Sequence, residues 1–352
     1  MKSKAAVIVG PRKVEIREIT IPEPGPGQVL IRQKACAICT LEQRIYTNVV
    51  SFGYPGVWGH EVSGVVEAIG PGVVAPLSVG DHVARGGSSA CGQCYYCAMG
   101  FDVACVREAE RLRNQSKMDD NPGSLKGIFG MSEYAVVDSH NLVKVSPAVP
   151  FEEACLVEPL ACVTQSANKL DVELGQTVVI IGAGTMGLLN ALVAKLRGAF
   201  VIVSEPDPRR RAKALELGVH AAIDPSQGDA AEQVKKLNDG RGADAVIVAI
   251  GNEKANADAL KMLGPQGKMM LFASAHPGVP IPLDPNVVHR SGIWITGSTS
   301  KNFKDFFQAS LLISRGILNV RPLIEKVLPL DRVGEALELA SSGGTYRIVV
   351  TM

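Results

Sequence analysis

The sequence lacks an excess of charge of either sign, a long apolar run and a secretory leader pattern. Its 36 Lys and Arg residues balance 35 Asp and Glu residues, which leaves no net field for nucleic acid or an anionic membrane. Gly, Asn or Lys interrupts every apolar stretch well before the roughly 20 residues that a membrane helix needs. Met1–Lys4 leads directly into a strand-like segment rather than a signal-peptide core. We therefore expect a cytoplasmic protein whose partner is a small-molecule substrate, with no role for nucleic acid or a membrane.

The chain also lacks internal repeats, but its composition changes twice along its 352 residues. Residues 1–161 are rich in Gly and Pro between short alternating segments, which favours a compact, mostly β domain. Strand-like and helix-like segments alternate through residues 162–298, which predicts a doubly wound parallel sheet and an α/β fold class. Residues 299–352 lack the partner elements for a separate domain, so we expect them to pack back on the first one. The elements predicted in this tail are helices at Phe303–Ser314 and Val333–Ser341 and a strand at Arg347–Val350.

The clearest local pattern lies at residues 178–205. Val178–Ile181 predicts a buried parallel strand that ends in the spacing G-x-G-x-x-G, where glycines allow a tight turn and close approach of backbone to a pyrophosphate. The helix that follows offers free N–H groups to the phosphates. A second strand, Phe200–Ser204, delivers Glu205, which could bind an adenosine ribose and would repel a 2′-phosphate. The pattern predicts dinucleotide binding and favours NAD over NADP, although the arginines at 209–211 could hold a 2′-phosphate.

The eight cysteines occur without a secretion signal, which suggests reduced or metal-bound thiols rather than disulfides. Four of them follow the spacing C-x2-C-x2-C-x7-C, at Cys91, Cys94, Cys97 and Cys105. Two-residue gaps let successive thiolates turn onto one tetrahedral ion, and four sulfurs leave no open position for substrate. We therefore predict a structural zinc site; the alternative is a redox C-x-x-C pair.

A catalytic zinc needs three mixed ligands and an open position. Cys39, His60 and Glu158 are the candidates, although each could instead be an ordinary buried thiol, a core histidine or a carboxylate at a helix start. Adjacent residues of a regular strand point to opposite faces, so His60 and Glu61 could not both reach one ion there. Gly59 permits an irregular backbone, and Glu61 stays a possible ligand or a partner of one.

Together these motifs resemble the zinc-dependent medium-chain dehydrogenase/reductases of the alcohol dehydrogenase superfamily. The resemblance covers nearly the whole chain and rests on Gly59-His60-Glu61, Val79-Gly80-Asp81-His82-Val83, the four-cysteine loop and the dinucleotide motif. Glu158-Pro159-Leu160 is most similar to the sorbitol (polyol) and threonine dehydrogenase branch. The resemblance implies a GroES-like catalytic domain, a Rossmann domain, two zinc ions per chain, and a homodimer or homotetramer with Val287–Ser300 as the dimer edge strand.

The resemblance also assigns residues by position. Cys39 and His60 would be catalytic-zinc ligands, with Glu61 or Glu158 completing the shell. The structural zinc would be held by Cys91, Cys94, Cys97 and Cys105. The positions that would contact the cofactor are Gly182, Gly184, Thr185, Met186, Gly187, Glu205 and Arg210.

The residues after Cys39 depart from the family pattern, which usually has Ser or Thr two positions on, Asp at three and often His at five. Here Leu41 cannot relay a proton from an alcohol, and Arg44 is a poor base at neutral pH. Glu42 can still orient His60, with altered geometry because its side chain is longer. The candidates left for proton transfer, together with water, are Thr40, Glu42, Glu61 and Glu158.

The favoured function is reversible oxidation of a secondary alcohol on a polyol, cyclitol or sugar-like substrate, with zinc as the Lewis acid and NAD as the hydride acceptor. One alternative is a reductase of an activated C=C or C=N bond, for which the missing relay would matter little. The other is a cofactor-binding protein with a decayed site. Residues 106–126 are unusually charged for the family and are a candidate lid or subunit contact, or a solvated loop.

Overall fold

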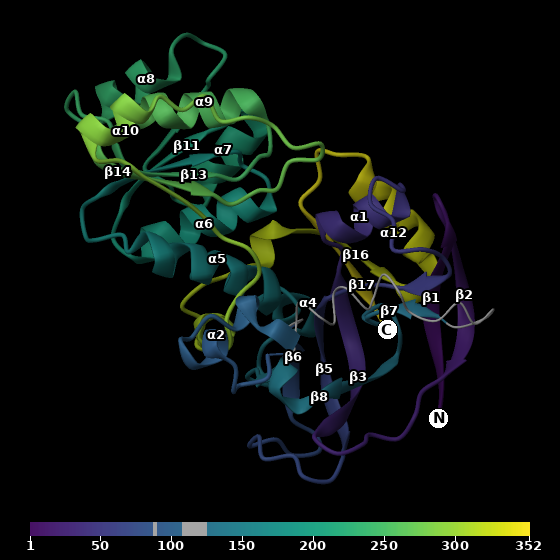
Figure 1. The fold of residues 1–352 in the computed structure, drawn as a ribbon. Helices are drawn as coiled ribbons and strands as arrows, with labels where there is room; N and C mark the ends of the chain where they lie inside the picture. Colours follow the sequence, from purple (N-terminus) through teal and green to yellow (C-terminus); the bar gives the residue numbers. More distant parts are fainter. Residues whose placement is uncertain (87–89, 108–124) are drawn as a thin grey trace. The chain divides into compact units, whose positions relative to one another are not determined.

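The computed structural model describes residues 1–86, 90–107 and 125–352, which form two compact units (Figure 1). The first unit contains Met1–Ala161 together with Lys301–Met352, and the second contains Cys162–Ser300. The first boundary falls inside helix α5 (Val157–Leu170). Most of the segment 106–126, for which a lid or subunit contact is predicted, lies outside the described residues.

A seven-stranded sheet forms the centre of the first unit. Its strands follow the order β16-β17-β3-β5-β6-β9, and β8 pairs with β3. β17 is parallel to β16 and antiparallel to β3, so a strand from the end of the described chain lies beside one from its beginning. The strands are β3 (Gln28–Ala37), β5 (Glu61–Ile69), β6 (His82–Arg85), β8 (Tyr134–Asp138), β9 (Leu142–Lys144), β16 (Ile324–Pro329) and β17 (Arg347–Thr351).

A second, smaller sheet in this unit has the order β2-β1-β4-β7. Its strands are β1 (Lys2–Gly10), β2 (Lys13–Thr20), β4 (Gly56–Val57) and β7 (Lys126–Gly127). Between the sheets and helix α12 (Val333–Ser341), a buried cluster joins Cys36 and Trp58 to Leu337, Ile348 and Val350. The tail therefore shares one hydrophobic core with the N-terminal strands, and neither part could bury these side chains alone.

Short helices connect the strands of the first unit. They are α1 (Thr40–Tyr46), α2 (Tyr95–Ala98), α4 (Phe151–Ala154), α11 (Phe303–Ser314) and α12 (Val333–Ser341), with 3₁₀ turns η1 (Asp102–Ala104), η2 (Ser139–Asn141), η3 (Arg321–Leu323) and η4 (Leu330–Arg332). Among the described residues of both units, no helix combines the length and the apolar character that crossing a bilayer would require.

The second unit is a six-stranded parallel sheet in the order β12-β11-β10-β13-β14-β15. α6 covers one face, and α8 and α9 pack together on the other (Figure 1). The order reverses beside β10, where open α/β sheets bind their ligands. The predicted α/β class with a Rossmann-type sheet is confirmed. Its elements are β10 (Thr177–Ile181), α6 (Thr185–Leu196), β11 (Phe200–Ser204), α7 (Pro208–Glu216), β12 (Ala221–Ile223), α8 (Ala230–Leu237), β13 (Ala243–Val248), α9 (Glu253–Met262), β14 (Leu263–Leu271), α10 (Pro285–Ser291) and β15 (Trp294–Gly297).

The turn from β10 into α6 depends on two glycines. All five residues of β10 are buried, as a parallel strand covered on both faces must be. Gly182 then adopts a left-handed φ of 99°, which favours glycine. A Cβ atom on Gly187 would lie 1.8 Å from the carbonyl oxygen of Gly182. The first turn of α6 therefore packs against the end of the strand at a distance that only glycine allows.

We predict that Gly187→Ala destabilises the second unit, because the new methyl group meets backbone that cannot move aside. Overpacking of this kind costs about 1–3 kcal/mol, so the melting temperature should fall by several degrees. Gly184→Ala is the matched control, because a Cβ there meets nothing within 4 Å. Thermal unfolding of the two variants tests the packing, and equal melting temperatures would contradict it.

Candidate metal and cofactor sites

Helix α1 begins beside the predicted zinc ligand Cys39. Cys39 is the N-cap residue, and its backbone N–H donates to Glu42 Oε2 at 3.1 Å. A carboxylate in the first helical turn satisfies an orphan N–H group and interacts favourably with the helix dipole. Glu42 is completely buried, whereas Thr40, another predicted proton-transfer residue, is exposed at the start of α1. The helix start therefore fixes both the cysteine and the carboxylate.

Glu42 also contacts the loop that carries His60. Its Oε1 atom lies 2.8 Å from His60 Nδ1 and accepts the backbone N–H of Gly59 at 3.2 Å. Burial alone would lower the pKa of His60, but the charges of Glu42 and Cys39 and their hydrogen bonds raise it well above the usual value. Since Nδ1 faces Glu42, Nε2 is the nitrogen that a metal would use.

Two groups of possible ligand atoms share His60. Atoms of Cys39, Glu42 and His60 lie within 4.8 Å of one another, and so do atoms of His60, Glu61 and Glu158. Zinc binds thiolate, imidazole and carboxylate donors at about 2.0–2.3 Å, which brings tetrahedral ligands to within about 4 Å of each other. Zinc therefore suits these donors, and His60 is the one that the two groups share.

Glu61 is held by a cation that the sequence patterns do not indicate. Arg347 donates from Nε to Glu61 Oε2 at 2.8 Å and from Nη2 to Oε1, and both side chains are buried. The sheet explains the pairing, since Glu61 and Val349 both lie opposite Ala37 of β3. Burial raises the pKa of Glu61 to about 7, while the charge of Arg347 opposes that rise.

Glu158, in the first turn of α5, has a different buried cation. Lys301 Nζ donates to Glu158 Oε1, and the two residues are 3% and 4% exposed. Burial disfavours the charged carboxylate, but the Lys301 ammonium group outweighs it and lowers the pKa of Glu158. Neither Lys301 nor Arg347 was predicted as a site residue, because each is a lone basic residue without a motif.

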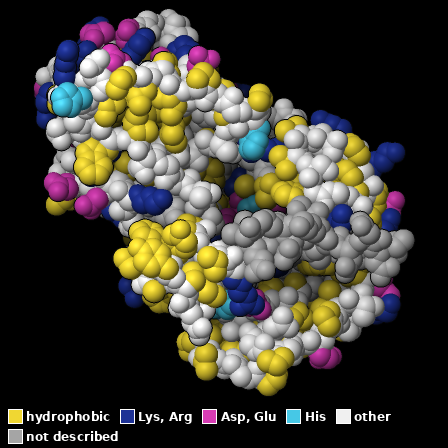
Figure 2. All heavy atoms as spheres, in the orientation of Figure 1, with side chains coloured by type: hydrophobic (Ala, Val, Ile, Leu, Met, Phe, Trp, Pro, Cys, Tyr) yellow, Lys and Arg dark blue, Asp and Glu magenta, His cyan; other side chains and the backbone are white. Residues whose placement is uncertain are grey.

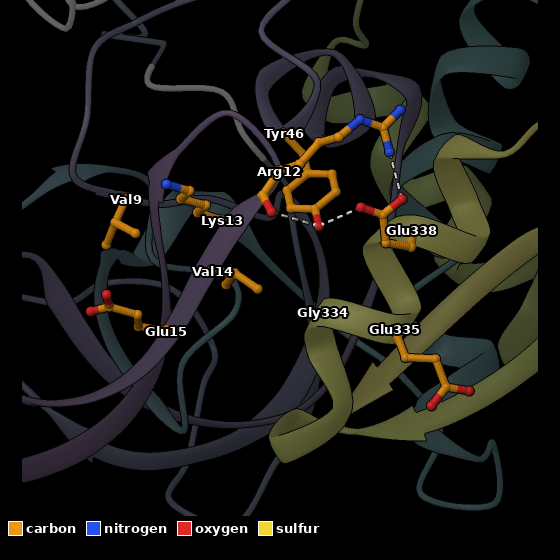
Figure 3. A pocket seen from close by; sticks show the side chains of 9 residues that line it. All are labelled: Val9, Arg12, Lys13, Val14, Glu15, Tyr46, Gly334, Glu335 and Glu338. Atoms are coloured by element: carbon orange, nitrogen blue, oxygen red, sulfur yellow. Dashed lines mark hydrogen bonds and ion pairs between the residues drawn. The ribbon is translucent and has the colours of Figure 1, made fainter.

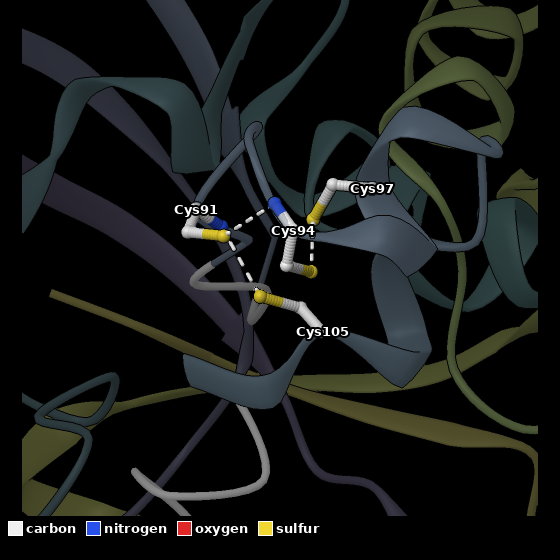
Figure 4. A group of neighbouring side chains, drawn as sticks. All are labelled: Cys91, Cys94, Cys97 and Cys105. Carbon is white, nitrogen blue, oxygen red and sulfur yellow. Dashed lines mark hydrogen bonds between the residues drawn. The ribbon is translucent and has the colours of Figure 1, made fainter.

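The four predicted cysteine ligands come together in one loop (Figure 4). Cys94 Sγ lies 3.5 Å from Cys97 Sγ, and the backbone N–H groups of Cys91 and Cys94 donate to Cys105 Sγ at 3.2 Å and Cys91 Sγ at 3.3 Å. Backbone N–H groups lower the pKa of Cys94 to about 6, whereas burial and the neighbouring thiols raise that of Cys97 to about 12. All four sulfurs lie within 4.8 Å of one another, which suits a tetrahedral zinc ion.

This cysteine loop has almost no apolar core of its own. Neither α2 nor η1 contains a buried residue. Hydrophobic side chains gather instead on the surface over α2 in Figure 2, where Tyr95, Met99 and Phe101 are all at least half exposed. A bound metal would therefore supply the cross-linking that apolar packing does not provide.

The predicted cofactor residues of the glycine motif lie along the turn into α6, with Gly184 as the N-cap and Thr185 and Met186 in its first turn. Glu205 follows β11 but does not point freely outward. Its two oxygens accept the backbone N–H groups of Ala183 at 2.8 Å and Asp207 at 3.0 Å. The carboxylate therefore also fixes the glycine turn, a contact that the sequence pattern does not indicate.

The arginines after Glu205 differ from one another. Arg209 is exposed beside Asp207, whereas Arg211 pairs with Asp224 at 3.1 Å and donates to the carbonyl oxygen of Glu205. The Nε atom of Arg210 is buried and has no hydrogen-bond partner within the described parts of the chain. Arg210 is therefore the arginine best suited to bind an added polar group.

A groove of about 520 Å³ lies away from all these residues (Figure 3). Tyr46, at the other end of α1 from Cys39, donates to Glu338 Oε1 at 2.9 Å, and its hydroxyl oxygen lies 3.3 Å from the carbonyl oxygen of Arg12. Burial and Glu338 raise the pKa of Tyr46 to about 12. The contact fastens α1 to α12. The groove is lined by Val9, Arg12, Lys13, Val14, Glu15, Tyr46, Gly334, Glu335 and Glu338.

A Rossmann-type unit combined with a cysteine cluster and a mixed Cys/His/carboxylate cluster defines a class of metal-containing, dinucleotide-linked oxidoreductases. Comparison with known proteins supports this class. The model of the alcohol dehydrogenase GroES-like domain matches residues 25–147, and that of the zinc-binding dehydrogenases matches residues 185–315. The chain belongs to the zinc-binding dehydrogenase family of the alcohol dehydrogenase superfamily, as predicted.

Three similar proteins illustrate the relationship. The chain is 35% identical over 348 residues to L-threonine 3-dehydrogenase of Pyrococcus horikoshii, covering 95% of this chain and 94% of that protein. It is 29% identical to sorbitol dehydrogenase of Halalkalibacterium halodurans, covering 100% and 99%. A crystal structure of an alcohol dehydrogenase zinc-binding domain protein from Burkholderia ambifaria superimposes with a TM-score of 0.90 at 26% identity, covering 100% and 99%.

Glu42→Ala should weaken zinc binding at the Cys39/His60 cluster by about 10–100-fold, because His60 loses the group that orients it. Stability should fall by about 2 kcal/mol or more, since two backbone N–H groups lose their acceptor. Zinc titration against a competing chelator and thermal unfolding measure the two effects. Glu67→Ala, which removes an exposed carboxylate of β5, should change neither. A Glu42→Ala protein that retains both properties would rule out this role.

Proposed function

We propose that this dehydrogenase carries out the reversible, NAD-linked oxidation of a secondary alcohol on a polyol, cyclitol or sugar-like substrate. The observation that carries the proposal is that His60 shares one group of possible ligand atoms with Cys39 and another with Glu158, so that a thiol and a carboxylate both lie near one imidazole. Three protein donors leave an open position on zinc for a substrate oxygen. L-Threonine and sorbitol, which name the relatives above, both contain a secondary hydroxyl group, and this similarity supports the substrate class.

When bound, zinc supplies Lewis-acid stabilisation of an alkoxide, and NAD supplies the hydride acceptor. Cys39, His60 and Glu158 would hold the metal. Glu42 accepts the Nδ1 proton of His60 and so fixes the tautomer that presents Nε2. Glu42 contacts three donors and is fully buried, which favours this orienting role over the predicted proton transfer. Thr40, exposed beside Cys39, is the better candidate to pass the alcohol proton to water.

Glu205 supports the preference for NAD. Its carboxylate is bonded to the glycine turn, so a negative charge stays fixed beside the phosphate-binding loop. A 2′-phosphate on the adenosine ribose would be repelled by that charge. NADP is the alternative cofactor, because Arg210, whose Nε atom is buried, could bind a 2′-phosphate.

The first test is zinc per chain, measured by elemental analysis on protein purified without chelators. We expect two zinc ions in the wild type and one in Cys39→Ala, because the cysteine cluster keeps its own. Polyols, cyclitols and sugars with NAD should then give activity that Cys39→Ala loses. A single zinc ion that the variant does not affect would refute the proposed site. Activity confined to NADH and activated C=C or C=N bonds would favour a reductase.

We also propose that the chain forms a homodimer or a homotetramer through β15. This strand ends the order of the second sheet, and the Trp294 side chain on it is 67% exposed. An exposed apolar edge strand invites pairing with another edge. Light scattering at micromolar concentration should give at least twice the monomer mass, and Trp294→Lys should shift it towards the monomer. A monomeric wild type would contradict this assembly.

A further inference from the structure

Two buried cations hold two buried carboxylates beside His60, but they hold them in different ways. Arg347 donates to both oxygens of Glu61 in a fork, whereas Lys301 donates from its single ammonium group to Oε1 of Glu158. One oxygen of each carboxylate belongs to the group of possible ligand atoms around His60. The two carboxylates are therefore similar in position and differ in their counter-ions.

A buried carboxylate needs a partner of opposite charge, because removing one partner of a buried ion pair leaves an uncompensated buried charge. Glu61 and Glu158 are 0% and 4% exposed, so each needs a counter-ion whenever no metal is bound. Lys301, which is 3% exposed, forms an ion pair with Glu158. A divalent metal ion at His60 would place a second positive charge near the same carboxylate.

The two cations differ in how readily they release a carboxylate. A guanidinium group is planar and binds two oxygens in a fixed geometry, whereas an ammonium group is a point charge on a flexible stem. The backbone next to Lys301 is fixed, because Asn302 caps α11 and its N–H donates to Asp305 Oδ2 at 3.0 Å. The lysine side chain can therefore move away from Glu158 without a change in this backbone.

We propose that Lys301 is a displaceable counter-ion, which neutralises Glu158 in the metal-free protein and competes with zinc for that carboxylate. Arg347 keeps Glu61 permanently paired, so Glu158 is the carboxylate that joins the metal. This inference rests on the proposed zinc site at Cys39 and His60. Lys301 acts through Glu158 and is therefore a positioning residue. Its ion pair with Glu158 stabilises the metal-free site and lowers the affinity of the site for zinc.

The test is the dissociation constant of zinc at the Cys39/His60 site, measured in the full-length protein by competition with a chromophoric chelator. Lys301→Met removes the competing charge and should tighten binding on the order of tenfold, the scale on which groups behind the ligands act. Lys301→Arg should weaken binding several-fold, because a fork would hold Glu158 as Arg347 holds Glu61. A merely structural lysine would give the opposite pattern, with weaker binding in Lys301→Met and rescue by arginine.

Three further proteins make the result decisive. Lys304→Met removes an exposed charge three residues away and should bind zinc as the wild type does. Glu158→Gln should bind more weakly, and adding Lys301→Met to it should change little, because the lysine acts through Glu158. Without metal, Lys301→Met should have a lower melting temperature than the wild type. Bound zinc should reduce this difference in melting temperature.

The outcomes separate this inference from the proposed function. A wild type with one zinc ion, unchanged in Cys39→Ala, refutes the proposed site itself. Two zinc ions with unaltered or weaker binding in Lys301→Met refute only the role of Lys301. If metal-free Lys301→Met does not fold, the zinc affinity of Lys301→Arg is the test. Zinc binding by that variant that is as tight as in the wild type, or tighter, overturns the proposal.

Discussion

The site around His60 depends on placing three carboxylates out of water within a small volume. Each carboxylate is stabilised differently: Glu42 by backbone N–H groups and an imidazole, Glu61 by a guanidinium fork, and Glu158 by an ammonium group. Isolated buried charges of this kind would be neutralised by protonation. These partners therefore offset the cost of burial and keep oxygen donors beside a thiol and an imidazole.

The partners also explain the discontinuous architecture of the first unit. Both cations belong to the tail, with Lys301 at its start and Arg347 at the start of β17. Tyr46 further joins α1 to Glu338 of α12. Without the tail, Glu61 and Glu158 would lose the cations that pair with them, and α1 would lose its contact with α12. The tail therefore stabilises the site as well as covering the sheet.

Local patterns in the sequence predicted much of this structure. The glycine spacing, the flanking strands and the tail helices at Phe303–Ser314 and Val333–Ser341 all follow from short-range periodicity. The cysteine spacing likewise indicated which four sulfurs would meet. The alternation argument about Glu61 was less informative, because β5 begins only at Glu61 and Gly59 adopts a φ of 104°, so His60 lies in irregular backbone.

Contacts between distant segments could not be predicted in this way. Lys301 and Arg347 are ordinary basic residues in the sequence, and only the pairing of β17 with β3 brings Arg347 to Glu61. The hydrogen bond from the backbone N–H of Ala183 to Glu205 was not predicted either. The sequence motif indicates which residues contact a cofactor, and not which contacts stabilise the turn itself. Sequence patterns therefore identified candidate donors, and the fold supplied their counter-charges.

The insertion of one unit within the other has a consequence for biosynthesis. Ala35 pairs with Thr351, so the side of β3 that faces β17 stays unpaired until the whole of Cys162–Ser300 has been translated. Nucleation across such a separation is slow, and unpaired strand edges are prone to aggregate meanwhile. The second unit, whose strands pair only among themselves, can fold first and shorten the loop that the first unit must close. Newly made chains should therefore depend on chaperones mainly through the N-terminal strands.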